Sequence, residues 1–117
     1  MDTNSDTTTF SRGVSSAVQV DSEKIILVDL EGTRVRVRPW RVRLESPDQE
    51  VIWVPADPSW QVDIEFKRGA LPKPCPAPAS RCHKRFEAGR PGLYEYDVIL
   101  ITPQGTYRVD PELEIRY

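Results

Sequence analysis

Three residues with soft, metal-binding side chains lie in one segment of the 117-residue chain: Cys75, Cys82 and His83. A structural zinc site normally takes four cysteine or histidine ligands, often supplied as closely spaced pairs. Here six residues separate the two cysteines, and no fourth ligand is evident. A catalytic thiol would also need an oriented base, which a histidine adjacent in sequence does not define. We therefore expect two unpaired thiols and no cofactor, with a disulfide as the alternative if the protein is exported.

Pairs of carboxylates spaced two residues apart could suggest a hydrolase. Such spacing places both members on one face of a strand, where solvent-facing residues occur. An acid–base pair needs an environment that separates the two pKa values, and nothing in the sequence indicates one. Phosphate-binding glycine motifs and the H-E-x-x-H metal motif are also missing from the sequence. We expect no enzymatic activity. The pairs are Asp63/Glu65, Glu95/Asp97 and Glu112/Glu114.

Five arginines alternate with apolar residues in a segment, 33–44, that has no acidic residue. On a strand they would form a basic ribbon able to meet phosphates or an acidic protein surface. A formal net charge of −2 makes the chain a poor nucleic-acid binder. The structural interpretation is cross-strand pairing with the carboxylates named above. The arginines are Arg34, Arg36, Arg38, Arg41 and Arg43.

The apolar alternation of this segment shifts by one residue at Arg38-Pro39. Val35 and Val37 share one parity, whereas Trp40, Val42 and Leu44 share the other. A strand cannot change its buried face without a bulge or bend, and proline lacks the N–H that a ladder needs. We predict a strand that bends, or crosses between sheets, at Pro39.

The remaining pattern is typical of an all-β fold with a single domain at residues 16–117. Period-two alternation and turn signals predict strands over residues 17–21, 24–30, 33–44, 51–54, 60–66 and 94–100, and one or two more within 107–117. Seven or eight such strands indicate a two-sheet Greek-key sandwich, with Trp40, Trp53 and Trp60 in its core. Residues 1–15 have too few apolar side chains to fold, which predicts a disordered tail. Residues 69–91 predict a long proline-rich loop.

Several short motifs follow the order found in one known family: Pro39-Trp-Arg-Val-Arg-Leu44, Glu50-Val-Ile-Trp-Val54 and Pro91-Gly-Leu-Tyr-Glu-Tyr96. Over about Val35 to Tyr117 the chain resembles the cupredoxin-like sandwich of blue-copper proteins, and immunoglobulin-like sandwiches share part of the pattern. The resemblance implies the fold and not the metal. Type-1 copper needs a thiolate and two imidazoles, yet Val98 stands at the family's cysteine position.

The leading functional expectation is a non-enzymatic module that binds a protein partner, possibly an acidic one. Recognition commonly resides in loops on a rigid scaffold, so the candidate surfaces are the arginine face and the proline-rich loop. Two alternatives stay open: a metal or redox protein using Cys75, Cys82 and His83, and a nucleic-acid binder using the arginines. Residues 1–16 lack the basic start and apolar run of a secretory signal, which favours the cytoplasm and no membrane partner. The loop candidates are Pro74, Pro76, Pro78, Arg81, Lys84 and Arg85.

Overall fold

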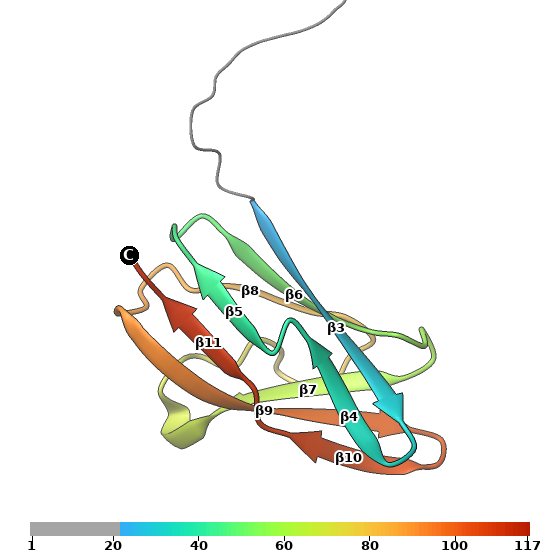
Figure 1. The fold of residues 1–117 in the computed structure, drawn as a ribbon. Helices are drawn as coiled ribbons and strands as arrows, with labels where there is room; N and C mark the ends of the chain where they lie inside the picture. The colour runs from blue at the N-terminus through green and yellow to red at the C-terminus, as the bar shows by residue number, and fades with distance from the viewer. Residues whose placement is uncertain (1–21) are drawn as a thin grey trace, which may run out of the picture.

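The computed structural model describes residues 22–117, which form two packed β-sheets (Figure 1). The predicted tail and the strand predicted over 17–21 lie outside the described residues. The two-sheet all-β architecture is confirmed, with nine strands within the described part rather than seven or eight for the whole chain. The strands are β3 (Glu23–Glu31), β4 (Arg34–Arg38), β5 (Arg41–Leu44), β6 (Glu50–Pro55), β7 (Gln61–Phe66), β8 (Cys82–Arg85), β9 (Gly92–Thr102), β10 (Gly105–Val109) and β11 (Glu112–Ile115).

One sheet has four strands in the order β4-β3-β6-β8, and the other has five. In the four-stranded sheet, β3 runs antiparallel to β4 and parallel to β6. In the five-stranded sheet, β7 and β10 both pair with the second half of β9, so they lie on its opposite edges. The first half of β9 pairs with β11, which in turn pairs in parallel with β5.

The predicted crossing between sheets at Pro39 is confirmed. β4 ends at Arg38 in the four-stranded sheet, and β5 begins at Arg41 in the other (Figure 1). The Arg38–Pro39 peptide is cis. Because the chain changes sheets here, Val37 before the proline and Val42 after it both point into the core, although they differ in parity.

Aromatic residues from both sheets meet in the core. The indole N–H of Trp53 on β6 donates to the Tyr96 hydroxyl on β9 at 3.2 Å, and the two rings meet edge to face at 5.7 Å. Phe66 lies 5.2 Å from the Tyr96 ring. Burial raises the pKa of the Tyr96 hydroxyl above its ordinary value.

The three tryptophans differ in burial, which corrects the prediction that all lie in the core. Trp53 is fully buried, and Trp60 is half-buried against the core. Trp40 is 46% exposed. It lies in the short connection between β4 and β5, where the chain runs from one sheet to the other and neither sheet covers it.

The proline-rich loop is shorter than predicted, because Cys82–Arg85 forms β8 and pairs with β6. This strand was missed since its residues, Cys-His-Lys-Arg, show no apolar alternation. It is an edge strand, and only Cys82 is buried. Apart from strands, the described chain has one 3₁₀ turn, η1 (Lys67–Gly69). Within residues 22–117 no helix is long and apolar enough to cross a membrane.

Candidate functional site on the outer faces of the sandwich

The predicted basic ribbon of five arginines is not formed, because the crossing at Pro39 divides it. Arg34, Arg36 and Arg38 lie on β4 and face outward from the four-stranded sheet, opposite the buried Val35 and Val37. Arg41 and Arg43 lie on β5 and face outward from the five-stranded sheet. The two groups therefore have to be considered separately.

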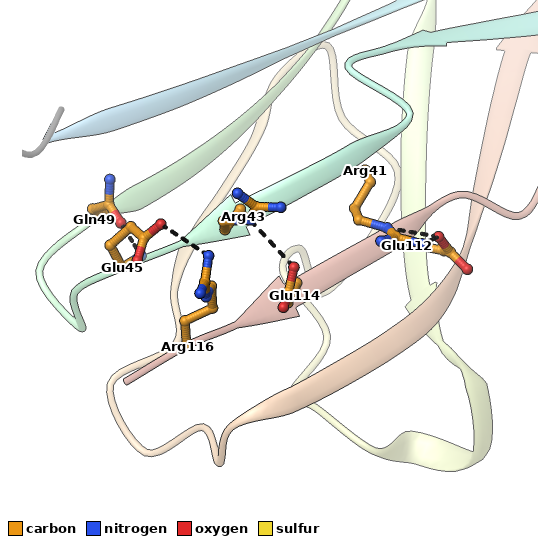
Figure 2. Close-up of polar contacts among 7 residues, drawn as sticks. All are labelled: Arg41, Arg43, Glu45, Gln49, Glu112, Glu114 and Arg116. Atoms are coloured by element: carbon orange, nitrogen blue, oxygen red, sulfur yellow. Dashed lines mark hydrogen bonds and ion pairs between the residues drawn. The ribbon is translucent and has the colours of Figure 1, made fainter.

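Arg41 and Arg43 take the structural role that the sequence predicted, cross-strand pairing. The parallel register of β5 and β11 sets them beside Glu112 and Glu114 (Figure 2). Arg41 donates from Nε and Nη2 to one oxygen of Glu112 at 3.0 and 2.8 Å. Arg43 donates to Glu114 at 3.3 Å. The charges on this part of the five-stranded sheet are thus neutralised within the molecule.

The same face pairs most of its other charges internally. Asp97 of β9 accepts from Lys67 at 2.8 Å and from Arg108 at 3.3 Å. It was predicted to face solvent, yet it is only 8% exposed because these two cations cover it. The hydrogen bond to Asp97 in turn raises the pKa of Lys67. Lys73 contacts the Asp63 carboxylate and lies 3.9 Å from Glu65. Of the paired carboxylates, all but Glu95 are therefore ion-pair partners of lysines or arginines in the described part of the chain.

The outer face of the four-stranded sheet differs in its apolar content, because β3 exposes two large apolar side chains, whereas β9 of the other sheet exposes one, Leu93. Ile25 is 57% and Leu27 38% exposed, alternating with the buried Ile26 and Val28. Their register partners on β6, Ile52 and Val54, are buried and half-buried, so the exposed apolar side chains lie on β3. Sequence reasoning missed this surface, because an uninterrupted apolar run is typical of a strand covered on both faces.

Cations lie along one side of this apolar surface. Arg38 is the cross-strand neighbour of Leu27, and Arg36 that of Asp29. Arg36 is paired with Glu31 at 2.5 Å. Among residues 22–117, Arg34 and Arg38 form no ion pair. We call the set formed by Ile25, Leu27, Arg34 and Arg38 the β3–β4 face.

The proline-rich loop is fastened to the body of the protein. Ala79 and Val62 exchange two backbone hydrogen bonds, of 2.8 and 3.0 Å, along the edge of β7. Leu71 and Cys75 are buried, and Lys73 donates to the Ile64 carbonyl oxygen at 3.2 Å. Of the candidate prolines, Pro74 is half-buried, whereas Pro76 and Pro78 are exposed. The loop thus covers a sheet edge through its buried residues, while its tip, Pro76 to Pro78, lies in solvent.

Cys75 and Cys82 form a disulfide with 5.7 Å between their Cα atoms, which corrects the expectation of two unpaired thiols. The loop brings Cys75 back against the inward-facing Cys82 at the start of β8. His83 points to the opposite, outer face, where its Nδ1 lies 2.8 Å from Glu50. The three candidate ligands therefore do not converge. In the described part of the chain, no three His, Cys, Asp or Glu side chains are grouped to hold a metal ion.

The basic residues after the loop surround a surface hollow of about 420 Å³. Lys84 and Arg85 line it together with Phe86, Arg90 and Tyr94, whereas the exposed Arg81 does not. Two of these groups already have hydrogen-bond partners. Arg85 donates to the Asp48 carbonyl oxygen at 3.1 Å, and the Tyr94 hydroxyl donates to the Arg90 carbonyl oxygen at 2.7 Å. Sequence reasoning had no means of finding this hollow, because separate segments form it.

The chain matches no family model and no curated protein. Among solved structures it is similar to a pseudoazurin from Sinorhizobium, with a TM-score of 0.50 and 15% identity over 81% of this chain and 75% of that one. A PKD domain of human KIAA0319 matches with a TM-score of 0.45 and 11% identity, over 89% of this chain and 92% of that domain. The fold is therefore a β-sandwich similar to that of the pseudoazurin. At these identities the likeness shows the fold alone.

The residues of this chain do not fit a blue-copper centre. Val98, at the position expected for the thiolate, is fully buried in the core between the sheets. The following hairpin, residues 99–108, contains neither histidine nor methionine, so the imidazole and thioether donors of such a centre are missing there. We derive no copper chemistry for this protein.

Proposed function

We propose that this protein is a non-enzymatic module that binds an acidic protein partner through the β3–β4 face. The observation that carries the proposal is the contrast between the two outer faces. The five-stranded sheet neutralises its arginines with Glu112 and Glu114. The four-stranded sheet leaves Ile25 and Leu27 in solvent, beside an arginine, Arg38, that has no ion-pair partner in the described part of the chain.

A partner would gain from both features of this face. Burying a fully exposed isoleucine or leucine side chain contributes on the order of 1.5–3 kcal/mol, and Ile25 and Leu27, which are already partly buried, would each contribute a part of that. Arginine guanidinium groups bind carboxylates with two parallel hydrogen bonds, which adds geometric specificity. An extended partner segment would therefore match this face if it had an apolar side chain to cover Leu27, followed by a carboxylate to bind Arg38.

The two alternative functions have less support. For nucleic acid, the division of the arginines leaves three on this face, and Asp29 and Glu31 lie among them. For metal or redox chemistry, the cysteines are joined in a disulfide and His83 lies on the other face of β8. The tip of the proline-rich loop, Pro76 to Pro78, is the second candidate contact surface, because it is exposed on a loop that is hydrogen-bonded to β7.

The proposal can be tested by selecting twelve-residue peptides from a random displayed library on the full chain. Bound peptides are then compared on two single variants, Ile25→Asn and Arg38→Gln. We expect selected sequences enriched in apolar and acidic residues, with affinity lowered at least tenfold by either substitution. Binding would be measured by fluorescence anisotropy at two salt concentrations, because the Arg38 contribution weakens with ionic strength.

The matched control is Arg41→Gln, which removes the same charge from the other outer face. Its ion pair with Glu112 is exposed, so its loss should cost no more than about 1 kcal/mol and leave the fold intact. Peptide affinity should not change in this variant. A library whose selected peptides bind all variants as tightly as the wild type would overturn the proposal.

The disulfide also bears on the cellular compartment in which the protein functions. We infer an oxidising compartment in place of the cytoplasm expected from the sequence, because structural disulfides persist mainly outside reducing compartments. Thiol alkylation and mass spectrometry of the protein taken from its native source should show Cys75 and Cys82 unmodified by the reagent. Two alkylated cysteines would favour the cytoplasm.

A further inference from the structure

We propose that the partner binds as an additional β-strand along the first half of β3. This inference rests on the proposed function, since it specifies how the β3–β4 face recognises its partner. The occupant is an extended segment of a partner protein, with alternating apolar residues and a carboxylate at the end that meets Arg38.

Part of β3 has a free edge, because its two neighbouring strands, β6 and β4, pair with different stretches of it. On one side, β6 pairs with residues Glu23 to Val28. On the other side, β4 pairs only with Leu27 to Glu31, because the chain leaves for the other sheet after Arg38 (Figure 1). Within residues 22–117, the stretch from Glu23 to Ile26 therefore has a strand on one edge only. Its unpaired backbone groups are a template for another strand.

This edge differs from those of β7, β5 and β8 in how it is protected. The β7 edge is covered by Ala79 of the proline-rich loop. The β5 edge carries Arg41 and Arg43, and the β8 edge has charged or polar side chains at three of its four residues. Charged side chains on short edge strands are the usual means of preventing strand addition. The free stretch of β3 also has two charged residues, Glu23 and Lys24, but they are followed by the exposed apolar Ile25, with Leu27 next to the end of the stretch.

The surroundings of the edge define the chemistry of the added strand. Glu23, Ile25 and Leu27 point outward, so the outward residues of the added strand lie beside an apolar surface. In strand addition, main-chain hydrogen bonds give affinity and alternate side chains give specificity. Arg38 marks the end of the free stretch, because it is the register partner of Leu27. A carboxylate at that end of the partner would meet its guanidinium group, and the exposed Trp40 follows two residues later.

The test uses the tightest-binding peptide from the selection described above and two N-methylated copies of it. One copy is methylated at the odd-numbered residues and the other at the even-numbered residues. N-methylation removes the backbone donors and keeps every side chain. We expect N-methylation at one of the two alternating sets of residues to lower affinity at least tenfold. Amide hydrogen exchange on the full chain, followed residue by residue, should show slower exchange within Glu23–Ile26 when the unmodified peptide is bound. Amides of Glu112–Ile115 on the other sheet serve as the control and should not change.

Two results would overturn strand addition. If both methylated series bind as tightly as the unmodified peptide, and still lose affinity in the Ile25→Asn variant, the partner contacts the face through side chains alone. The proposed function then stands and the strand inference fails. If amides throughout Glu23–Ile26 are already protected in the free full chain, another part of the chain or a second copy occupies the edge.

Discussion

Trp53 and Tyr96 illustrate how single residues join the two sheets. Both side chains are fully buried, one on each sheet, and each supplies the hydrogen-bond partner that the other needs. A buried donor that loses its acceptor incurs the desolvation cost of an unsatisfied group. The contact therefore fixes how the sheets pack as well as adding apolar area.

Replacing Tyr96 with phenylalanine should destabilise the protein by about 1–3 kcal/mol, because the Trp53 N–H is left buried without its acceptor. The free energy of unfolding would be measured by urea denaturation. Tyr94→Phe is the matched control: its hydroxyl donates to the Arg90 carbonyl oxygen at the surface, where water can replace the lost partner. Equal effects of the two substitutions would contradict the role given to the buried contact.

At the scale of elements, the proline-rich loop and β7 form a unit. The two backbone hydrogen bonds between Ala79 and Val62 pair the loop with the strand edge. Proline cannot donate such a bond, so the sequence places a non-proline residue between Pro78 and Ser80 where the donor is needed. A loop rich in prolines can thus both cover an edge and resist further pairing.

Ala79→Pro should therefore destabilise the protein by roughly 1 kcal/mol or more, since it removes the donor to the Val62 carbonyl oxygen. Ala77→Pro, on the exposed loop tip, provides the same substitution as a control and should have a smaller effect. Thermal unfolding of the two variants, monitored by circular dichroism, compares them directly. A larger loss for Ala77→Pro would show that the bridge does not hold the loop.

The disulfide closes this loop over seven residues of sequence separation. Constraining so short a loop should contribute roughly 2–3 kcal/mol through the entropy of the unfolded chain. We expect the Cys75→Ala/Cys82→Ala double variant to have a midpoint of urea unfolding lower than that of the oxidised wild type. The reduced wild type should resemble the variant. If reduction leaves the midpoint unchanged, the disulfide is not a stabilising element.

Most elements could be predicted from the sequence, because their residues alternate and their ends carry turn residues. A bend or a crossing at Pro39 was predictable from the change in parity together with the proline. β8 was not, because an edge strand with one buried residue gives no alternation. The exposure of Trp40 was also not predictable, since it depends on where the crossing runs relative to the two sheets rather than on any local pattern.

At the scale of the whole molecule, stability should fall in alkaline solution. Burial raises the pKa of the Tyr96 and Tyr117 hydroxyls, and Asp97 raises that of the Lys67 ammonium. For such groups the stabilisation is complete below the unfolded-state pKa, near pH 10, and is lost as the pH rises through the folded-state pKa. Urea midpoints measured from pH 8 to 11 should decline, and less steeply in the Tyr96→Phe variant. A parallel decline in both proteins would contradict this assignment.

The candidate site could be predicted only in part, for reasons that concern the arrangement of the whole molecule. The sequence shows that arginines alternate, but their neutralisation depends on a partner strand about seventy residues away, as with Arg41 and Glu112. It also shows that Ile25 and Leu27 are apolar, but whether anything covers them depends on the packing of distant segments. The expectation of two unpaired thiols was wrong for the same reason, since spacing alone does not show whether the fold brings two thiols together.

The separation between β5 and its partner strand also bears on synthesis at the ribosome. β3, β4 and β6 have emerged by Pro55 and can pair with one another at once. β5 lies between them in sequence, yet its ladder partner, Glu112–Ile115, emerges 71 residues later. During that interval Val42 and Leu44 have no sheet to join. The nascent protein therefore exposes an apolar strand before its partner strand exists, and transiently exposed apolar segments of this kind are prone to aggregation.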